Sequence, residues 1–162
     1  DPAFEQGYYK VNPEAGIRAF ARIWAGWGPS QAFYRRKLHR QLGQETAADH
    51  MAEFWEPNFL AFDANDLMGM LHTWQVANIA DNIIYNGDYA AACGAITAKT
   101  ILMPCLTDLY FPVADNEIQV DLMSNAELRP IPSDWGHIAG GPGLNPEDSS
   151  FIDQAHKELL AS

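Results

Sequence analysis

The sequence predicts an α/β fold in which a helical region over residues 1–87 precedes a short parallel βαβ unit within residues 88–162. Three observations support this prediction: apolar residues recur at helical spacing through the first half, an extended apolar run follows over 100–106, and a helical segment separates that run from a second one at 126–131. Consecutive strands joined by a helix pair in parallel. Because a parallel sheet needs more strands and two covered faces, we expect this unit to be incomplete as a stand-alone sheet.

Composition restricts the classes of partner. The chain has 162 residues, 48% of them hydrophobic, which is enough for a sizeable core. Its net charge of -11 would be repelled by nucleic acid and by anionic membranes, so neither is expected as a partner. No apolar run approaches the roughly 20 residues of a membrane span, and the start at Asp1 lacks the features of a secretory signal. We therefore expect a cytoplasmic protein.

The two cysteines, Cys93 and Cys105, lie in apolar surroundings without CxxC spacing. This pattern favours buried free thiols in a reducing compartment, with a disulfide or a nucleophilic thiol as the alternatives.

Four helices and no strand are expected before residue 88. The first begins at Asn12-Pro13-Glu14, with Asn12 as the capping side chain, and ends at Gly28-Pro29-Ser30. The second carries Phe33 and a basic cluster, which is more typical of a solvated face or a salt-bridge patch than of a polyanion site. The cluster consists of Arg35, Arg36, Lys37 and Arg40, with Arg18 or Arg22 alongside.

Capping signals define the next two helices. Thr46 and Asp49 have the spacing of a capping box, and Pro57 is expected to kink or stop the helix that follows. Asp63 and Asp66 have the same capping-box spacing, and they are expected to begin a longer helix that reaches Asn86-Gly87.

The second half alternates helices and strands. Asp88 caps a short helix over 89–97, and the strand over 100–106 contains Pro104, which is tolerated only near a strand end or a bulge. Pro112 begins the crossover helix, and Asn145 opens the last helix after the strand at 126–131.

Asp108 and His137 are the candidate catalytic residues. An acid just after an apolar strand, followed 29 residues later by a histidine in a Gly-rich turn, is how the acid and base of a Ser-His-Asp triad are arranged in α/β-hydrolases. The alternatives are that Asp108 caps the helix at Pro112 and that His137 is a loop histidine satisfied by backbone groups.

Four stretches carry a resemblance to a known family: Asp1-Pro2-Ala3-Phe4, Phe62 to Leu67, Thr107 to Pro112, and Ser133-Asp134-Trp135-Gly136-His137. In this order they resemble the homoserine O-acetyltransferase family of α/β-hydrolase fold enzymes. The resemblance implies a helical lid over 1–87 and the C-terminal part of the hydrolase core over 88–162. It also implies that Asp108 is the triad acid, that His137 is the general base, and that acetyl-CoA or another acyl-CoA is the acyl donor of a serine acyltransferase. No bound cofactor is implied, and a homodimer formed through the lid is consistent with it.

The nucleophile is expected outside this sequence. No Gly-x-Ser-x-Gly motif surrounds any serine of the chain, at 30, 124, 133, 149, 150 or 162. A segment upstream of the lid, or another chain, would have to supply the serine and the oxyanion hole, and the 162 residues alone should be inactive.

Ile138 departs from the family pattern. In homoserine-using members the residue after the histidine is an Asp that holds the substrate ammonium, which an isoleucine cannot do; leaving that cation buried and unpaired costs several kcal/mol. A different acceptor is therefore expected: another alcohol, an amine, or water, the last making an esterase-like hydrolase.

The remaining histidines, His39, His50, His72 and His156, fall on predicted helices without metal-binding spacing, so no metal is expected. Two further hypotheses stay open. One is a non-catalytic helical module that docks a partner through Trp24, Trp27, Trp55 and Trp74. The other is a homologue that kept the fold and lost the activity.

Overall fold

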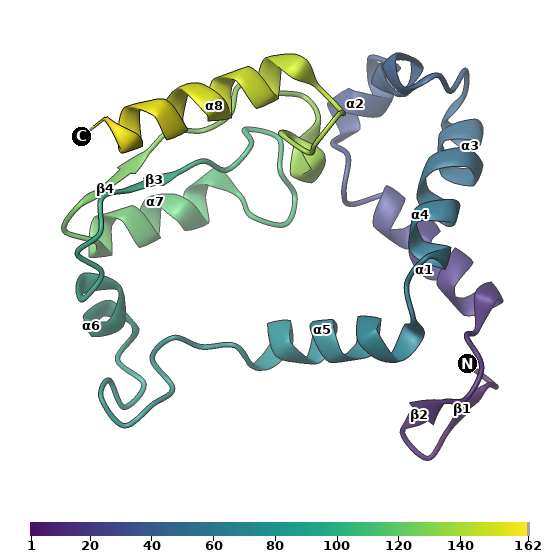
Figure 1. The fold of residues 1–162 in the computed structure, drawn as a ribbon, viewed down its shortest axis with the longest axis horizontal. Helices are drawn as coiled ribbons and strands as arrows, with labels where there is room; N and C mark the ends of the chain where they lie inside the picture. The colour runs from purple at the N-terminus through teal and green to yellow at the C-terminus, as the bar shows by residue number, and fades with distance from the viewer. Residues whose placement is uncertain (162) are drawn as a thin grey trace. The chain divides into compact units, whose positions relative to one another are not determined.

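A computed structural model describes residues 1–161, and the chain divides into two compact units. The first unit comprises Asp1–Gly26 and Lys37–Ala77, and the second comprises Trp27–Arg36 together with the chain from Asn78 onward (Figure 1). The predicted division into a lid over 1–87 and a hydrolase core over 88–162 stays a prediction.

The first unit opens with an antiparallel hairpin, β1 (Phe4–Glu5) and β2 (Tyr8–Tyr9). Its two-residue turn places Gln6 and Gly7 at φ 53° and 86°, the left-handed region that tight hairpin turns require. The prediction of no strand in the first half is wrong here. Strands of two residues are too short to show an alternating pattern.

Helix α1 (Glu14–Ala25) begins where expected, but Asn12 does not cap it. The Asn12 amide bonds instead to the start of a distant helix, accepting from Ala64 N–H at 2.9 Å and donating to the Phe62 carbonyl at 2.9 Å. Its polar side chain therefore ties two segments together.

The capping box at Thr46 is confirmed, with both reciprocal hydrogen bonds present at the start of α3 (Ala47–His50). Of the two outcomes expected at Pro57, a kink or a stop, the structure excludes the stop: the helix continues through the π-helical turn η2 (Met51–Trp55) into α4 (Glu56–Leu60). A π-helical turn shifts the hydrogen-bond pairing by one residue, and directly before Pro57 it accommodates a residue that has no N–H to donate.

The buried apolar core of the first unit includes Ile17, Ala21, Ala25 and Trp55, and half-buried aromatic rings pack beside it. Phe59 of α4 packs edge-on against Phe20 at 5.2 Å and lies 5.8 Å from Trp24, both on α1. Trp55 is buried and stacks on the same Phe59 ring at 6.1 Å. The apolar faces of α1 and α4 thus pack against each other.

Helix α5 (Ala64–Val76) is capped by Asp63 but ends ten residues earlier than predicted. The reason is local competition for backbone groups. Asn78 accepts from Ala80 N–H at 2.9 Å, and Asn82 accepts from Ile84 and Tyr85 N–H, so side chains bond groups that a helix would use.

The predicted basic cluster is divided between the two units, with Arg35 and Arg36 in the second and Lys37 and Arg40 in the first. Lys37 has a φ of 57° and separates α2 (Gln31–Arg35) from the 3-10 helix η1 (Leu38–Leu42). Arg36 pairs with Asp134, and Arg40 lies 3.4 Å from Glu45. Arg18 and Arg22 both bond the buried Glu56 at 2.7 Å.

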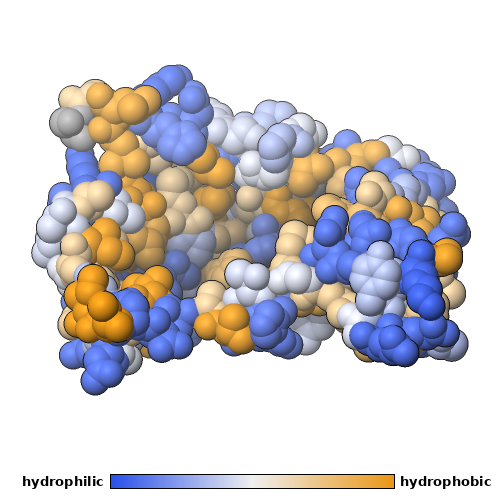
Figure 2. All heavy atoms as spheres, turned by 60° about the horizontal axis from the view of Figure 1, so that its bottom comes forward, coloured by the Kyte–Doolittle hydropathy of each residue, from blue (hydrophilic) through white to orange (hydrophobic). Residues whose placement is uncertain are grey.

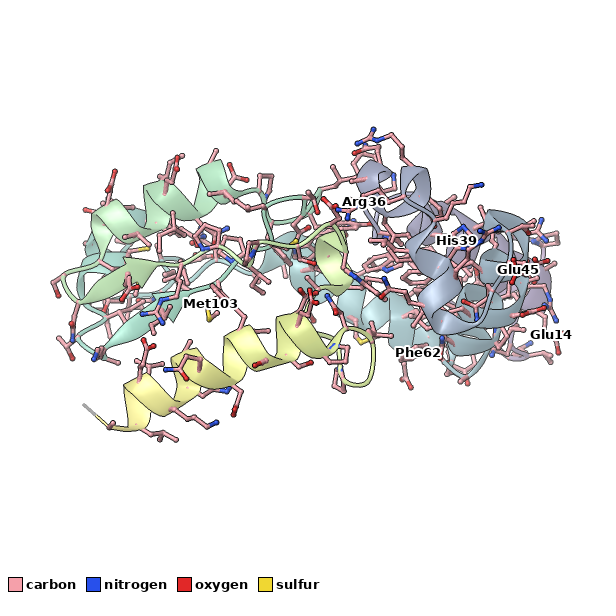
Figure 3. All side chains as sticks on the ribbon, turned by 90° about the horizontal axis from the view of Figure 1, so that it is seen from above. Glu14, Arg36, His39, Glu45, Phe62 and Met103 are labelled. Atoms are coloured by element: carbon pink, nitrogen blue, oxygen red, sulfur yellow. The ribbon has the colours of Figure 1, made fainter. Side chains whose placement is uncertain are left out.

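The second unit contains the predicted parallel βαβ unit. Strand β3 (Thr100–Leu102) pairs in parallel with β4 (Ala126–Leu128), and α7 (Val113–Leu122) connects them. Figures 1 and 3 show α7 and α8 (Pro146–Leu160) on opposite sides of the strand pair. Within residues 1–161, this sheet has two strands.

Pro104 interrupts the predicted seven-residue strand. Regular pairing ends at Leu102, and a single parallel bridge between Cys105 and Ile131 resumes beyond the proline. The Pro104 carbonyl still accepts from Ile131 N–H at 2.8 Å, so the chain stays extended up to the turn that follows.

Helix α6 (Tyr89–Gly94) is capped by Asp88 as predicted, and it is shorter than expected. Cys93 on this helix and Cys105 are both buried and free, which confirms the prediction of unpaired thiols. In the stretch from residue 1 to 161, no helix combines the length and the apolarity that crossing a membrane needs.

Several large apolar side chains remain exposed. In the first unit they include Met70, Trp74 and Val76 on α5, and in the second unit Ile79, Ile83 and Ile84. Figure 2 shows apolar atoms gathered at several places among hydrophilic ones on the face it displays.

Candidate active site

Asp108 lies in a tight turn just beyond the Cys105–Ile131 bridge. Its N–H donates to the Cys105 carbonyl at 3.1 Å, which closes the turn. Its Oδ1 accepts from the N–H groups of Tyr110 at 2.7 Å and Phe111 at 3.2 Å. The helix-cap alternative is wrong, since α7 begins at Val113 without a side-chain cap. Asp108 caps its own turn and keeps Oδ2 for another partner.

His137 lies in the 3-10 turn η3 (Gly136–Ile138). Its backbone N–H donates to the Gly28 carbonyl at 2.8 Å. Gly136 has a φ of 69°, and a Cβ atom at this position would lie 2.6 Å from the Ser30 nitrogen and 2.7 Å from the Gly28 oxygen. Only glycine fits such a close approach of two backbones.

The two candidate residues meet. Asp108 Oδ2 lies 3.1 Å from His137 Nδ1, with the Asp108 side chain 7% exposed and the His137 side chain 27% exposed. A proton on Nδ1 satisfies this hydrogen bond and leaves Nε2 as the basic nitrogen, which is the tautomer that a triad base needs.

Aromatic rings surround the imidazole. Tyr110 and Phe111, both from the Asp108 turn, have ring centroids 4.9 Å and 5.3 Å from that of His137, and Trp27 lies 6.1 Å from Tyr110. Burial, and then the negative charge of Asp108, raise the pKa of Tyr110. Its phenol therefore stays neutral beside the acid.

A pocket of about 420 Å³ opens beside this pair. The end of β3 and the chain after it supply an apolar wall, which includes Met103, labelled in Figure 3. Asn116 and Gln119 of α7 add polar groups. The remaining lining residues are Leu102, Pro104, Cys105, Asp108, Phe111, Ile131, Gly136, His137 and Ala139.

Sequence reasoning missed the residues that hold the histidine turn. Ser30 Oγ donates to the Asp134 carbonyl at 2.5 Å, and buried Phe33 packs edge-on against buried Trp135 at 5.3 Å. The segment expected to end the first helix thus supports the site. These contacts join residues about a hundred positions apart, and no local spacing announces them.

The other histidines lie elsewhere, on helices as predicted: His39 in η1, His50 in α3, His72 in α5 and His156 in α8. Among residues 1–161, no three or more Cys, His, Asp or Glu side chains are grouped so as to hold a metal ion. That the protein uses no metal or bound cofactor stays a prediction.

Comparison with known proteins identifies esterases as relatives. No family model matches the chain. A probable esterase of Corynebacterium glutamicum is 34% identical over 161 residues, covering 98% of this chain and 44% of that protein. The ethyl acetate hydrolase of Pseudomonas veronii is 35% identical over 167 residues, covering 100% of this chain and 46% of that protein.

Solved structures of similar fold are also esterases. An acetylester hydrolase from Corynebacterium glutamicum superposes with a TM-score of 0.92 at 34% identity, over 100% of this chain and 46% of that one. The acetyl esterase MekB superposes with a TM-score of 0.93 at 34% identity, over 100% of this chain and 47% of that one. The chain therefore spans about half the length of these relatives, and its likeness is to hydrolases. These comparisons do not support the expected resemblance to homoserine O-acetyltransferases.

Proposed function

We propose that this chain supplies the acid and the base of a serine esterase, with Asp108 as the acid and His137 as the base. The observation that carries the proposal is the 3.1 Å contact between Asp108 Oδ2 and His137 Nδ1. Two backbone N–H groups hold the other oxygen of Asp108, so the carboxylate has a fixed direction toward the imidazole.

The reaction follows from this geometry. A serine outside these 162 residues attacks the ester carbonyl, and His137 Nε2 takes the hydroxyl proton and then gives it to the departing alcohol. Water next attacks the acyl-serine and gives its proton to the same nitrogen, which returns it to the serine as the acid leaves. Asp108 holds the imidazole tautomer and stabilises the imidazolium in both steps.

Water is the acceptor that the chain favours. Ile138, next to the base, cannot pair with the ammonium of homoserine, and a buried unpaired cation is costly. The relatives named above are esterases, two of them described as acetyl-ester hydrolases and one as an ethyl acetate hydrolase. Small acetyl esters are therefore the proposed substrates.

The nucleophile belongs to the same proposal. Ser30 and Ser133 donate their hydroxyl protons to the Asp134 carbonyl and to Asp148, and no serine of the chain stands in a Gly-x-Ser-x-Gly elbow. The serine and the oxyanion hole come from another segment or chain. A lid over 1–87 that also forms a homodimer remains part of the proposed organisation.

The test uses the intact protein with ethyl acetate and 4-nitrophenyl acetate, beside acetyl-CoA with homoserine. We expect ester hydrolysis and no homoserine acetylation. His137→Ala should remove hydrolysis, whereas His156→Ala, an exposed residue of α8 that does not line the pocket, should not. Efficient acetylation of homoserine would overturn the choice of water, and hydrolysis that survives His137→Ala would overturn the site.

A further inference from the structure

We propose that Thr107, Ser133 and Asp148 form a positioning network that sets the separation of Asp108 and His137. The inference rests on the proposed esterase function and adds three residues that act through the pair without touching substrate. In this network the Thr107 hydroxyl connects the Asp108 turn to the His137 turn, and the buried Asp148 carboxylate bonds the Ser133 hydroxyl.

The Thr107 hydroxyl connects the two catalytic turns directly. It donates to the Ser133 carbonyl at 2.9 Å and accepts from the Gly136 N–H at 3.2 Å. Thr107 directly precedes Asp108, and Gly136 directly precedes His137. The Thr107 hydroxyl therefore joins the two segments of the chain one residue before each catalytic side chain. The Cys105 thiol also donates to the Ser133 carbonyl, at 3.2 Å, but within residues 1–161 only Thr107 is seen to bond Gly136 as well.

The Asp148 carboxylate supports the histidine turn from α8. It is 4% exposed, and its Oδ2 accepts from Ser133 Oγ at 2.9 Å. The same Ser133 oxygen accepts from Trp135 N–H at 3.1 Å. Ser133 is thus held on both sides, by Thr107 at its carbonyl and by Asp148 at its hydroxyl. This buried hydrogen bond ties the first turn of α8 to the histidine turn.

The consequence for catalysis is geometric. The imidazole must keep Nδ1 on Asp108 while Nε2 faces the serine, and a displacement of about 1 Å can lower the rate roughly a hundredfold. A network that fixes the two turns against each other affects the chemical step and leaves ground-state binding of the ester unchanged. It therefore predicts a loss in kcat with KM preserved.

Thr107→Val in the intact protein is the principal test, because valine keeps the shape and removes the hydroxyl. We expect kcat to fall about tenfold or more with KM within twofold, and Thr107→Ser, which restores the hydroxyl, to recover most of it. Thr100→Val is the matched control. Its hydroxyl also bonds a backbone carbonyl, that of Ala98 at 3.0 Å, but on β3 and away from both turns.

Asp148→Ala and Ser133→Ala test the second support, with the exposed Asp153→Asn and Ser150→Ala on α8 as controls. If Asp148→Ala does not fold, Thr107→Val still decides the question. A Thr107→Val enzyme with unchanged kcat, or one whose KM alone rises, would overturn the network.

A crystal structure of Thr107→Val separates this inference from the proposed function. We expect the distance from Asp108 Oδ2 to His137 Nδ1 to lengthen beyond 3.1 Å or to split into two conformers. That readout does not depend on activity. If His137→Ala left hydrolysis intact while Thr107→Val still moved the pair, the function would be wrong and the network right. An unmoved pair in Thr107→Val would reject the network alone.

Discussion

The two oxygens of Asp108 have separate tasks. One closes the turn through the N–H groups of Tyr110 and Phe111, and the other faces His137. The sequence left open whether Asp108 caps the following helix or faces His137. It caps its own turn and not the helix, and its second oxygen faces His137. A capped turn is what gives the carboxylate a fixed direction.

Asp108→Asn should therefore preserve the fold and abolish most of the ester hydrolysis. The asparagine oxygen can still accept from the backbone of the turn, but its NH₂ group would face Nδ1 and favour the tautomer with the proton on Nε2. We expect kcat for ester hydrolysis to fall by about 10⁴, as the wrong tautomer does in other triads. Steady-state kinetics of the intact protein, with circular dichroism to check folding, measure this. Hydrolysis at the native rate would exclude Asp108 as the acid.

Gly136 offers a test of how closely the histidine turn is packed. Gly136→Ala combines an unfavourable φ of 69° with overlap on the backbone of Gly28 and Ser30, and we expect a loss of stability beyond the roughly 1–3 kcal/mol of backbone strain alone. Gly143→Ala is the control, since its φ is 76° but nothing lies within 4 Å. Thermal unfolding should rank Gly136→Ala well below Gly143→Ala. Equal melting temperatures would show that the close approach is not maintained in solution.

Among the elements, the helices whose ends carry local capping signals are those that sequence predicts. Thr46, Asp88 and Asn145 each accept from a backbone N–H of the helix that they precede. Where prediction fails, side chains bond at long range or compete locally. Asn12 bonds residues about fifty positions away, and Asn78 and Asn82 end α5 early.

A buried histidine joins α3 to the π-helical turn in the first unit. His50 Nε2 accepts from Trp55 Nε1–H at 2.9 Å, and Nδ1 lies 3.1 Å from Gln44 Oε1. The Gln44 amide is itself oriented, because its Nε2 donates to the Leu42 carbonyl at 2.8 Å. A neutral ring with its proton on Nδ1 satisfies both partners, whereas a proton on Nε2 would break the bond to Trp55.

This arrangement predicts acid sensitivity of the first unit. Burial, and then the charge of nearby His39, lower the pKa of His50 from 6.5 to about 4. Between these values the unfolded chain binds a proton at His50 that the folded chain does not, so the free energy of unfolding falls as the pH falls through this range. We expect a loss of about 3 kcal/mol from pH 7 to pH 4 at this site.

Urea unfolding of the intact protein, followed by hydrogen exchange over residues 44–59, measures the change. His50→Gln can still accept from Trp55 and does not titrate, so its stability should depend less on pH. If the native and His50→Gln proteins lost stability equally on acidification, another group would be responsible.

At the scale of the molecule, the order of strand, helix and strand could be predicted because each element has its own period and its own boundary signals. The hydrogen bonds that hold the Asp108 and His137 turns together could not be predicted from the sequence. Thr107, Ser133 and Asp148 are ordinary polar residues in sequence, and their roles arise only when three separate segments meet. The segment 27–36 is a similar case, since it was grouped with the first helices and belongs to the second compact unit.

The location of the nucleophile is the prediction that concerns the whole protein. The 162 residues hold an acid and a base in contact and no nucleophile elbow, and they match about half the length of each esterase relative. Treating the intact protein with a serine-reactive phosphonate and mapping the adduct by peptide mass spectrometry should find one modified serine, within a Gly-x-Ser-x-Gly motif outside this stretch. His137→Ala should slow labelling by orders of magnitude, because the serine then lacks its base. An adduct on Ser30, Ser133 or any other serine of these residues would mean that the acid and base serve a nucleophile of their own chain, and the division of the triad would have to be abandoned.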